Sequence, residues 1–182
     1  MRFEPKNILL RDGTAATLRS PEVSDAQALL DYLKLTAGET DFLMRYPEEV
    51  TMTLEDEERY LSSAIDSPCE LMLLCEVDGR LAGNCALSMT NRIKTRHRGT
   101  VAIALCGEFW GKGIGSAMFE ALIAVARQRG LAQLELKVIE GNDRARALYE
   151  KFGFRTTAVH PDAIRLKDGR QLCEYLMIKK LA

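Results

Sequence analysis

Glu108-Phe-Trp-Gly-Lys-Gly-Ile-Gly-Ser116 sets three glycines at alternate positions just ahead of an amphipathic helical pattern. Glycine lets the backbone turn tightly and approach a ligand closely, because it carries no side chain. The free N–H groups of such a loop would point outward at the positive end of the helix, which suits a pyrophosphate. A Walker loop is excluded because Cys106 stands in place of its first glycine, and a Rossmann turn because Ser116 replaces its last. A glycine-rich turn without a ligand is the alternative interpretation.

The segments on both sides of this loop alternate between strand and helix patterns. Apolar residues recur at helical spacing after the loop, and residues 132–139 alternate apolar and charged, as in a strand with one face against the core. The predicted elements are strands at 99–105, 132–139, 154–160 and 172–179, a helix from the loop to Gly130, and a short helix from Asn142 or Asp143 to Gly153.

Two helices and a hairpin are expected ahead of that region. Asp78-Gly79 is a strong tight-turn signal between two apolar runs, and Thr53 is a helix cap followed by acidic residues. The predicted elements are strands at 14–20, 70–77 and 81–90, a helix that Pro21 opens, and a helix from Thr53 to about Asp66. Hairpins are antiparallel and strand–helix–strand units are parallel, so an α/β fold with a mixed sheet covered by helices is predicted.

The composition is typical of a chain that buries a real core, with 47% apolar and 28% charged residues, and 182 residues fit one domain over 1–182. A net charge of −1 does not point to nucleic acid or a membrane surface, and no apolar run approaches the roughly 20 residues of a membrane span. Five cysteines without a Cys-x-x-Cys pair indicate reduced thiols and a cytoplasmic protein. No metal site is expected, because neither of the two histidines has a second ligand at metal spacing.

A second segment with a pattern of its own lies further along the chain. Asn142-Asp-Arg-Ala-Arg-Ala-Leu-Tyr-Glu-Lys-Phe-Gly-Phe154 reads N-x-x-A-x-x-L-Y-x-x-x-G-F. Together with the glycine loop it resembles the coenzyme-A-binding core of the GNAT superfamily of acetyl-CoA-dependent N-acetyltransferases, specifically over about 99–154. The resemblance implies a GNAT-like three-layer fold of about six to seven strands in a single domain. It also implies central strands splayed to admit CoA and acceptor-side elements at about 1–68.

The resemblance implies where acetyl-CoA binds. The pantetheine arm would lie along the strand before the loop, and the pyrophosphate would rest on the loop amides. Trp110 departs from the Gln or Arg with which the family pattern begins, which leaves the amide cradle intact. Asn142 matches the family asparagine that commonly bonds the pantetheine arm, and a helix cap is its alternative role. The implied cofactor-binding residues are Ile103, Ala104, Leu105, Gly111, Lys112, Gly113, Ile114, Gly115, Ser116, Asn142 and Tyr149.

The resemblance also implies direct attack of a neutral amine on the thioester, with a backbone N–H near Leu105 stabilising the oxyanion. Tyr149 matches the family tyrosine near the thioester sulfur and would act as general acid toward the departing thiolate. A tyrosine packed on a helix face is the alternative. Many relatives carry a glutamate near the position of Thr100, so Glu39 and Asp41 are the substitute candidates for the base.

The acceptor is expected to be a primary amine of a small molecule or a peptide. Residues 39–58 are strongly acidic, and in the family the first two helices and their connection shape the acceptor pocket. An acidic rim there would attract a cationic acceptor, whereas a solvated helix start is the alternative. The oligomeric state stays open, since members of the family often form homodimers.

Two rival interpretations accompany this one. A non-catalytic acyl-CoA-binding sensor or regulatory module is the alternative function, for which the missing glutamate at Thr100 leaves room. A covalent step through Cys106 is the alternative chemistry. Direct transfer is preferred to it, because no histidine or carboxylate is placed by the sequence to activate the thiol.

Overall fold

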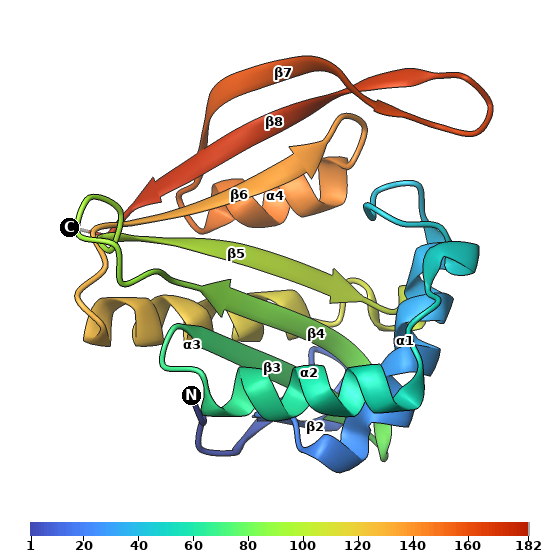
Figure 1. Ribbon diagram of the computed structural model, residues 1–182, viewed down its shortest axis with the longest axis vertical. Coiled ribbons are helices and arrows are strands. Elements are labelled where there is room, and N and C mark those ends of the chain that lie inside the picture. Colours follow the sequence, from blue (N-terminus) through green and yellow to red (C-terminus); the bar gives the residue numbers. More distant parts are fainter. Residues whose placement is uncertain (182) are drawn as a thin grey trace.

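The computed structural model describes residues 1–181 and contains one mixed sheet of eight strands. The strand order is β1-β2-β3-β4-β5-β6-β8-β7, and α2 and α3 lie on opposite faces of the sheet (Figure 1). The strands are β1 (Lys6–Leu9), β2 (Ala15–Arg19), β3 (Glu70–Val77), β4 (Arg80–Ser88), β5 (Arg98–Leu105), β6 (Gln133–Ile139), β7 (Arg155–Arg165) and β8 (Gln171–Lys180). The helices are α1 (Ala26–Glu39), α2 (Leu54–Asp66), α3 (Ile114–Gln128) and α4 (Asp143–Lys151), with 3-10 turns at Val23–Asp25, Pro47–Glu49 and Gly107–Phe109.

The predicted mixed sheet is confirmed, but it has eight strands where six to seven were expected. The additional strand is β1, which pairs antiparallel with β2 at the edge of the sheet. Three of its four residues are exposed, so the segment lacks the alternation that marks a half-buried strand. Backbone pairing rather than core packing places it in the sheet, and this pairing leaves no pattern in the side chains.

Two elements differ from their predicted bounds. The helix expected from Pro21 starts as a 3-10 turn, and α1 begins only at Ala26, because the Asp25 carboxylate accepts from Glu22 N at 2.7 Å and holds the turn. Strand β7 continues to Arg165, beyond the expected end near residue 160. A register shift between His160 and Ile164 carries the pairing past Pro161, which has no N–H to donate.

Local signals at turns and caps are confirmed. Asp78 and Gly79 have φ of 48° and 74°, the positive values that a two-residue hairpin turn requires. The hydroxyl of Thr53 accepts from Asp56 N at 3.1 Å, and the Asp56 carboxylate accepts in return from Thr53 N at 3.1 Å. This capping box starts α2 at the predicted residue. Gly130, with φ of 71°, follows the end of α3.

The central strands are splayed, as the family resemblance implies. Strands β5 and β6 run parallel and pair only over three residues, where Arg98–Thr100 of β5 faces Gln133–Glu135 of β6. Beyond this point β5 stays paired with β4, and β6 with β8. Figure 1 accordingly shows β5 and β6 side by side at their starts and diverging toward their C-terminal ends. The second half of β5 therefore has one edge outside the sheet pairing.

Candidate functional site

The open edge of β5 presents specific backbone groups. Cys106 N donates to Ala82 O at 3.0 Å, so the alternation of an antiparallel ladder turns the even-numbered residues of β5 toward β4. The N–H and C=O groups of Val101, Ile103 and Leu105 therefore face the side of β6, where strand pairing has already ended. Apart from Leu105 O, which accepts from Trp110 Nε1, this edge offers an extended ligand the hydrogen bonds of an additional strand.

Two glycines let the side chain of Leu105 lie between β4 and α3. A Cβ at Gly83 would overlap the Leu105 side chain, and a Cβ at Gly115 would lie 3.6 Å from its Cδ1. A Cβ at Gly115 would also lie 2.9 Å from Leu148 Cδ2, which is closer than such atoms normally pack. The first turn of α3 can therefore approach α4 only because residue 115 has no side chain. The end of β5, α3 and α4 thus meet in close contact.

The glycine loop carries an uninterrupted row of unpaired amides. Gly111 and Gly113 have φ of 77° and 100°, which turns the chain sharply before α3. Within residues 1–181, no N–H group from residue 111 to 116 donates a hydrogen bond, and the first backbone donor of the helix is Ala117, to Gly113 O at 3.1 Å. Orphan N–H groups at the positive end of a helix form an anion site.

Arg11 holds the loop from behind. Its N–H donates to Lys112 O at 2.9 Å, and its guanidinium donates to Gly111 O at 3.3 Å. Two loop carbonyls are therefore turned toward Arg11, in the connection between β1 and β2. Sequence reasoning missed this residue, because it lies 100 positions from Gly111 and no local pattern marks it.

Cationic side chains surround the loop, but not only the expected one. Lys112 Nζ lies 3.2 Å from a carboxylate oxygen of Asp12, so part of its charge is already neutralised. Lys151, on α4, donates to the hydroxyl of Ser116 at 3.0 Å. Arg11 and Lys151 therefore add positive charge where the sequence had suggested Lys112 alone.

The beginning of α4 is tied to the end of β5. Asn142 caps α4, since its Oδ1 accepts from Ala145 N at 3.3 Å, which leaves its side-chain NH₂ without a partner within residues 1–181. Trp110 Nε1 donates to Leu105 O at 2.9 Å, and the guanidinium of Arg144 stacks 3.7 Å from the centre of the Trp110 ring. The tryptophan that departs from the family pattern thus links β5 to α4.

Tyr149 is held by an aromatic cluster. Its ring lies 5.5 Å from that of Phe119 and 6.3 Å from that of Phe154, and the residue is 6% exposed. Burial raises the pKa of its phenol to about 12. The hydroxyl has no hydrogen-bond partner in the described chain, and that chain contains no unpaired side-chain polar atom sealed from solvent. The raised pKa keeps the phenol protonated at ordinary pH. Because the hydroxyl is unpaired but not sealed, it contacts solvent and is free to donate its proton.

The two base candidates have different partners. A carboxylate oxygen of Glu39, at the end of α1, accepts from Gly107 N at 2.7 Å, directly beyond the end of β5. Asp41 lies 3.4 Å from the guanidinium of Arg170, in the β7–β8 connection. Burial, followed by the nearby charge of Glu39, raises the pKa of the Cys106 thiol to about 11. A thiol that stays protonated is a poor nucleophile, which agrees with direct transfer.

Most acidic residues of 39–58 are already occupied by partners. Besides Glu39 and Asp41, these pairs are Glu48 with Lys167, Glu49 with Tyr46 N, Glu55 with Arg59, and Asp56 with Thr53 and Arg59. Glu57 differs, because the residue is only 5% exposed and its carboxylate forms no hydrogen bond in the described chain, although its oxygens still reach solvent. Burial raises its pKa, against a smaller opposing effect of Arg45. Four of the eight carboxylates in this segment have a Lys or Arg partner, whereas Glu39, Glu49, Glu57 and Glu58 have none in the described chain, so the segment keeps net negative charge.

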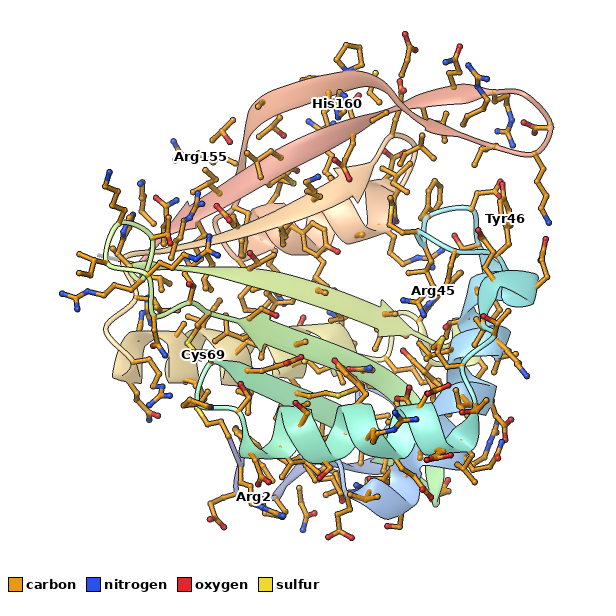
Figure 2. The ribbon with its side chains drawn as sticks, viewed as in Figure 1. Arg2, Arg45, Tyr46, Cys69, Arg155 and His160 are labelled. Atoms are coloured by element: carbon orange, nitrogen blue, oxygen red, sulfur yellow. The ribbon has the colours of Figure 1, made fainter. Side chains whose placement is uncertain are left out.

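The connection between α1 and α2 contacts the β7–β8 connection and the turn after β6, on the other side of the gap between β5 and β6. Tyr46 OH accepts from Lys167 N at 3.0 Å, and the Lys167 ammonium lies 4.2 Å from the centre of the Tyr46 ring. The ring of Phe42 lies 3.6 Å from the position that a Cβ of Gly141 would occupy, at the turn between β6 and α4. Figure 2 shows Arg45 and Tyr46 in this connection, beside the end of the β7–β8 hairpin. An acceptor reaching β5 from this side would pass these residues.

Two further properties concern the described residues only. Residues 1–181 contain no group of three or more His, Cys, Asp or Glu side chains that could hold a metal ion. Among the helices of this same range, none is both long enough and apolar enough to cross a membrane.

Comparison of the sequence with known proteins finds acetyltransferases among its relatives. A mycothiol acetyltransferase from Beutenbergia cavernae is 35% identical over 118 residues, which are 63% of this chain and 38% of that protein. A putative [ribosomal protein bS18]-alanine N-acetyltransferase from Bacillus subtilis is 26% identical over 54% of this chain and 63% of that protein. The chain thus spans about two fifths of the mycothiol acetyltransferase and less than two thirds of the second relative.

Solved structures match over nearly the whole chain. An acetyltransferase of the GNAT family from Streptococcus pneumoniae has a TM-score of 0.85 and 29% identity, over 91% of this chain and 99% of that one. A putative acetyltransferase from Salmonella typhimurium, solved with its cofactor acetyl-CoA, has a TM-score of 0.78 and 20% identity, over 92% and 94%. The sequence profile of the acetyltransferase (GNAT) family matches residues 36–154, a span that includes the splayed strand, the amide loop and Tyr149. The chain therefore belongs to the GNAT family of acetyltransferases.

Proposed function

We propose that the protein transfers an acetyl group from acetyl-CoA to a primary amine by direct attack. The observation that carries this proposal is the row of unpaired amides from residue 111 to 116, next to the open edge of β5. A diphosphate on the amides and an extended arm on the strand edge together match the two chemically different parts of CoA. The neighbouring fold solved with acetyl-CoA supports the choice of ligand.

In this proposal the pyrophosphate rests on the N–H groups of residues 111–116, with Arg11 and Lys151 adding positive charge. The pantetheine arm bonds the backbone of Ile103 and Leu105 along the open edge, and the free NH₂ of Asn142 reaches it from α4. Ala104 then contributes through its place in the strand, since its own N–H and C=O turn toward β4.

The chemistry follows from these positions. The amine nitrogen forms a bond to the thioester carbon, and the tetrahedral oxyanion accepts from a backbone N–H on the open edge of β5, near Leu105. Collapse breaks the carbon–sulfur bond, and Tyr149 gives its proton to the CoA thiolate while the base takes one from the amine. Glu39 is the preferred base, acting through water, because its carboxylate lies at Gly107 beside the end of β5. The products are the acetylated amine and free CoA.

The acceptor side is proposed to consist of α1, α2 and their connection, about residues 1–68. The relatives' names mention mycothiol and an alanine of a ribosomal protein, which supports an amine of a small molecule or of a peptide as the acceptor class. The net negative charge that residues 39–58 keep, with four of the eight carboxylates lacking a Lys or Arg partner, supports an acceptor that carries positive charge.

The test is release of free thiol from acetyl-CoA with a panel of small amines and N-terminal peptides. Turnover above the rate without amine, together with the acetylated product by mass spectrometry, is expected for at least one acceptor. Binding of acetyl-CoA without thiol release for any acceptor would favour the alternative, a non-catalytic acyl-CoA sensor. A protein that binds no CoA species would refute both functions.

A further inference from the structure

The point at which β5 and β6 separate carries a pair of polar side chains. Thr100 and Glu135 are the last residues that face one another in the parallel pairing of these strands. One carboxylate oxygen of Glu135 lies 3.4 Å from the hydroxyl of Thr100, and the other lies 3.5 Å from the guanidinium of Arg98. The carboxylate is therefore held at the closed end of the gap between the two strands, where the open edge of β5 begins.

Strand alternation turns this carboxylate away from α3. The side chains of Ile103 and Leu105 lie toward α3, since a Cβ at Gly115 would lie 3.9 Å and 3.6 Å from them. Successive side chains of a strand point to opposite faces, so Thr100 points to the other face, together with its partner Glu135. Helix α2 lies on that face, opposite α3 (Figure 1), so the carboxylate faces the side from which the acceptor is proposed to enter.

The acyl end of acetyl-CoA would approach the same point. In the proposed complex the diphosphate rests on residues 111–116, and the arm follows the open edge of β5 back past Leu105 and Ile103. Ile103 is three residues from Thr100, which corresponds to about 10 Å of strand. An amine about 3–3.5 Å from the thioester carbon, followed by one water, fills that length. The carboxylate of Glu135 is therefore within reach of the amine through a single water.

This carboxylate has acceptor positions free for a ligand. Both of its contacts are longer than ordinary hydrogen bonds, and an ionised carboxylate has about four acceptor positions. Its side chain is 20% exposed, so water and an ammonium group can reach it. The other charged groups on this face of β6 and β8 have partners of their own. These pairs are Lys137 with Glu174 and Lys180 with Gln133.

The acceptor nitrogen must lose two protons in this reaction. A primary amine is mostly protonated near pH 7, so one proton leaves before the attack and the second leaves after the carbon–nitrogen bond has formed. In the proposed mechanism Glu39 takes the second proton, as the tetrahedral intermediate collapses. The first proton requires an acceptor where the amine enters, and a carboxylate also attracts the positive charge of the ammonium group.

We infer that Glu135 receives the ammonium form of the acceptor and takes, through one water, the proton that must leave before the attack. The N–H bond breaks and the electron pair stays on nitrogen. The carboxylate keeps the proton during the attack and returns it to solvent through its exposed side afterwards. This inference rests on the proposed acetyl transfer and adds a second proton acceptor to it. Sequence reasoning missed Glu135, because a charged residue in an alternating strand indicates only an exposed face.

The test is the pH profile of kcat/KM for the small amine that the wild type acetylates fastest. Glu135→Gln keeps the shape of the side chain and removes its charge. Glu76→Gln is the matched control, since Glu76 is also a strand carboxylate paired with an arginine, 3.0 Å from Arg19. At pH 7 we expect Glu135→Gln to lower kcat/KM for the amine about 100-fold, with unchanged KM for acetyl-CoA, whereas Glu76→Gln should keep the wild-type value.

The loss in Glu135→Gln should shrink as the pH rises. This variant depends on amine that is already neutral, and that fraction grows about tenfold per pH unit below an amine pKa of about 10. The wild type should stay nearly level between pH 7 and 9, so the two profiles should converge. An unchanged rate in Glu135→Gln, a loss that is the same at every pH, or an equal loss in Glu76→Gln would overturn the inference.

A second variant returns the carboxylate from the facing strand. Thr100→Glu in the Glu135→Gln background should regain about tenfold in kcat/KM at pH 7, because residues 100 and 135 are directly paired. No recovery in a double variant that keeps its Tm would also overturn the inference, since a carboxylate at this point would then have no effect. A wild-type protein that binds CoA but releases no thiol with any amine refutes the proposed transfer instead.

Discussion

Comparing Gly113→Ala with Gly130→Ala distinguishes the contribution of the loop amides to CoA binding from the effect of a strained residue on the stability of α3. Gly113 has φ of 100° and precedes the first residue of the helix, whereas Gly130 has φ of 71° and follows its end. A Cβ at Gly113 would meet nothing closer than the Arg11 side chain at 3.5 Å, and one at Gly130 nothing within 4 Å. Alanine is therefore strained at both positions by its backbone conformation and at neither by a clash.

The two substitutions should cost similar stability and differ in ligand binding. A left-handed residue other than glycine costs roughly 1–2 kcal/mol, which lowers Tm by about 2–8 °C in a chain of this size. Only Gly113→Ala turns an N–H out of the row from residue 111 to 116. A hydrogen bond to a charged group contributes about 1.5–3 kcal/mol, so the Kd for CoA should rise about 10- to 150-fold.

Differential scanning fluorimetry gives Tm for both variants, and titration calorimetry gives the Kd for CoA. Gly130→Ala is expected to bind CoA as tightly as the wild type despite its lower Tm. Equal affinities in Gly113→Ala and Gly130→Ala would refute the reasoning, because the unpaired amides would then not be the site of the diphosphate.

Three further outcomes are expected. Tyr149→Phe should lower kcat by about 10²-fold, near the low end for a general acid, with little change in CoA affinity; equal rates of thiol release in the two proteins would remove Tyr149 from the mechanism. Glu57→Gln should raise Tm near pH 7 by about 2–4 °C. Burial raises the pKa of Glu57 in the folded protein, so the native state binds more protons than the unfolded state and loses stability as pH rises above about 4.3. Unfolding from pH 4 to 8 checks this, and an unchanged difference in Tm across that range would contradict it. Gly83→Ala should destabilise the fold by about 1–3 kcal/mol and weaken CoA binding, since its Cβ would push Leu105 off the open edge; denaturant unfolding and calorimetry would detect both, and unchanged affinity would be the contrary result.

Local chemistry made much of the fold predictable. The hairpin at Asp78-Gly79, the capping box at Thr53 and the helix after the glycine loop depend on backbone preferences within a few residues, and all three occur where the sequence indicates. The edge strand β1 escaped prediction because it is held by backbone pairing, with its side chains mostly exposed. The continuation of β7 past Pro161 depends likewise on a register shift against β8.

The candidate site likewise has one part that could be predicted from short segments and another that depends on tertiary contacts. The sequence by itself determined the glycine loop, its helix and the positions of Asn142 and Tyr149, because glycine conformation, capping and helical spacing are properties of short segments. Only the tertiary structure decided which groups contact that loop and strand: Arg11 on the loop carbonyls, Tyr32 on the Ala104 carbonyl, and Glu39 on the N–H of Gly107. These contacts join residues far apart in the chain, and the energies of burial and hydrogen bonding that distinguish them exist only once the sheet and its helices have assembled.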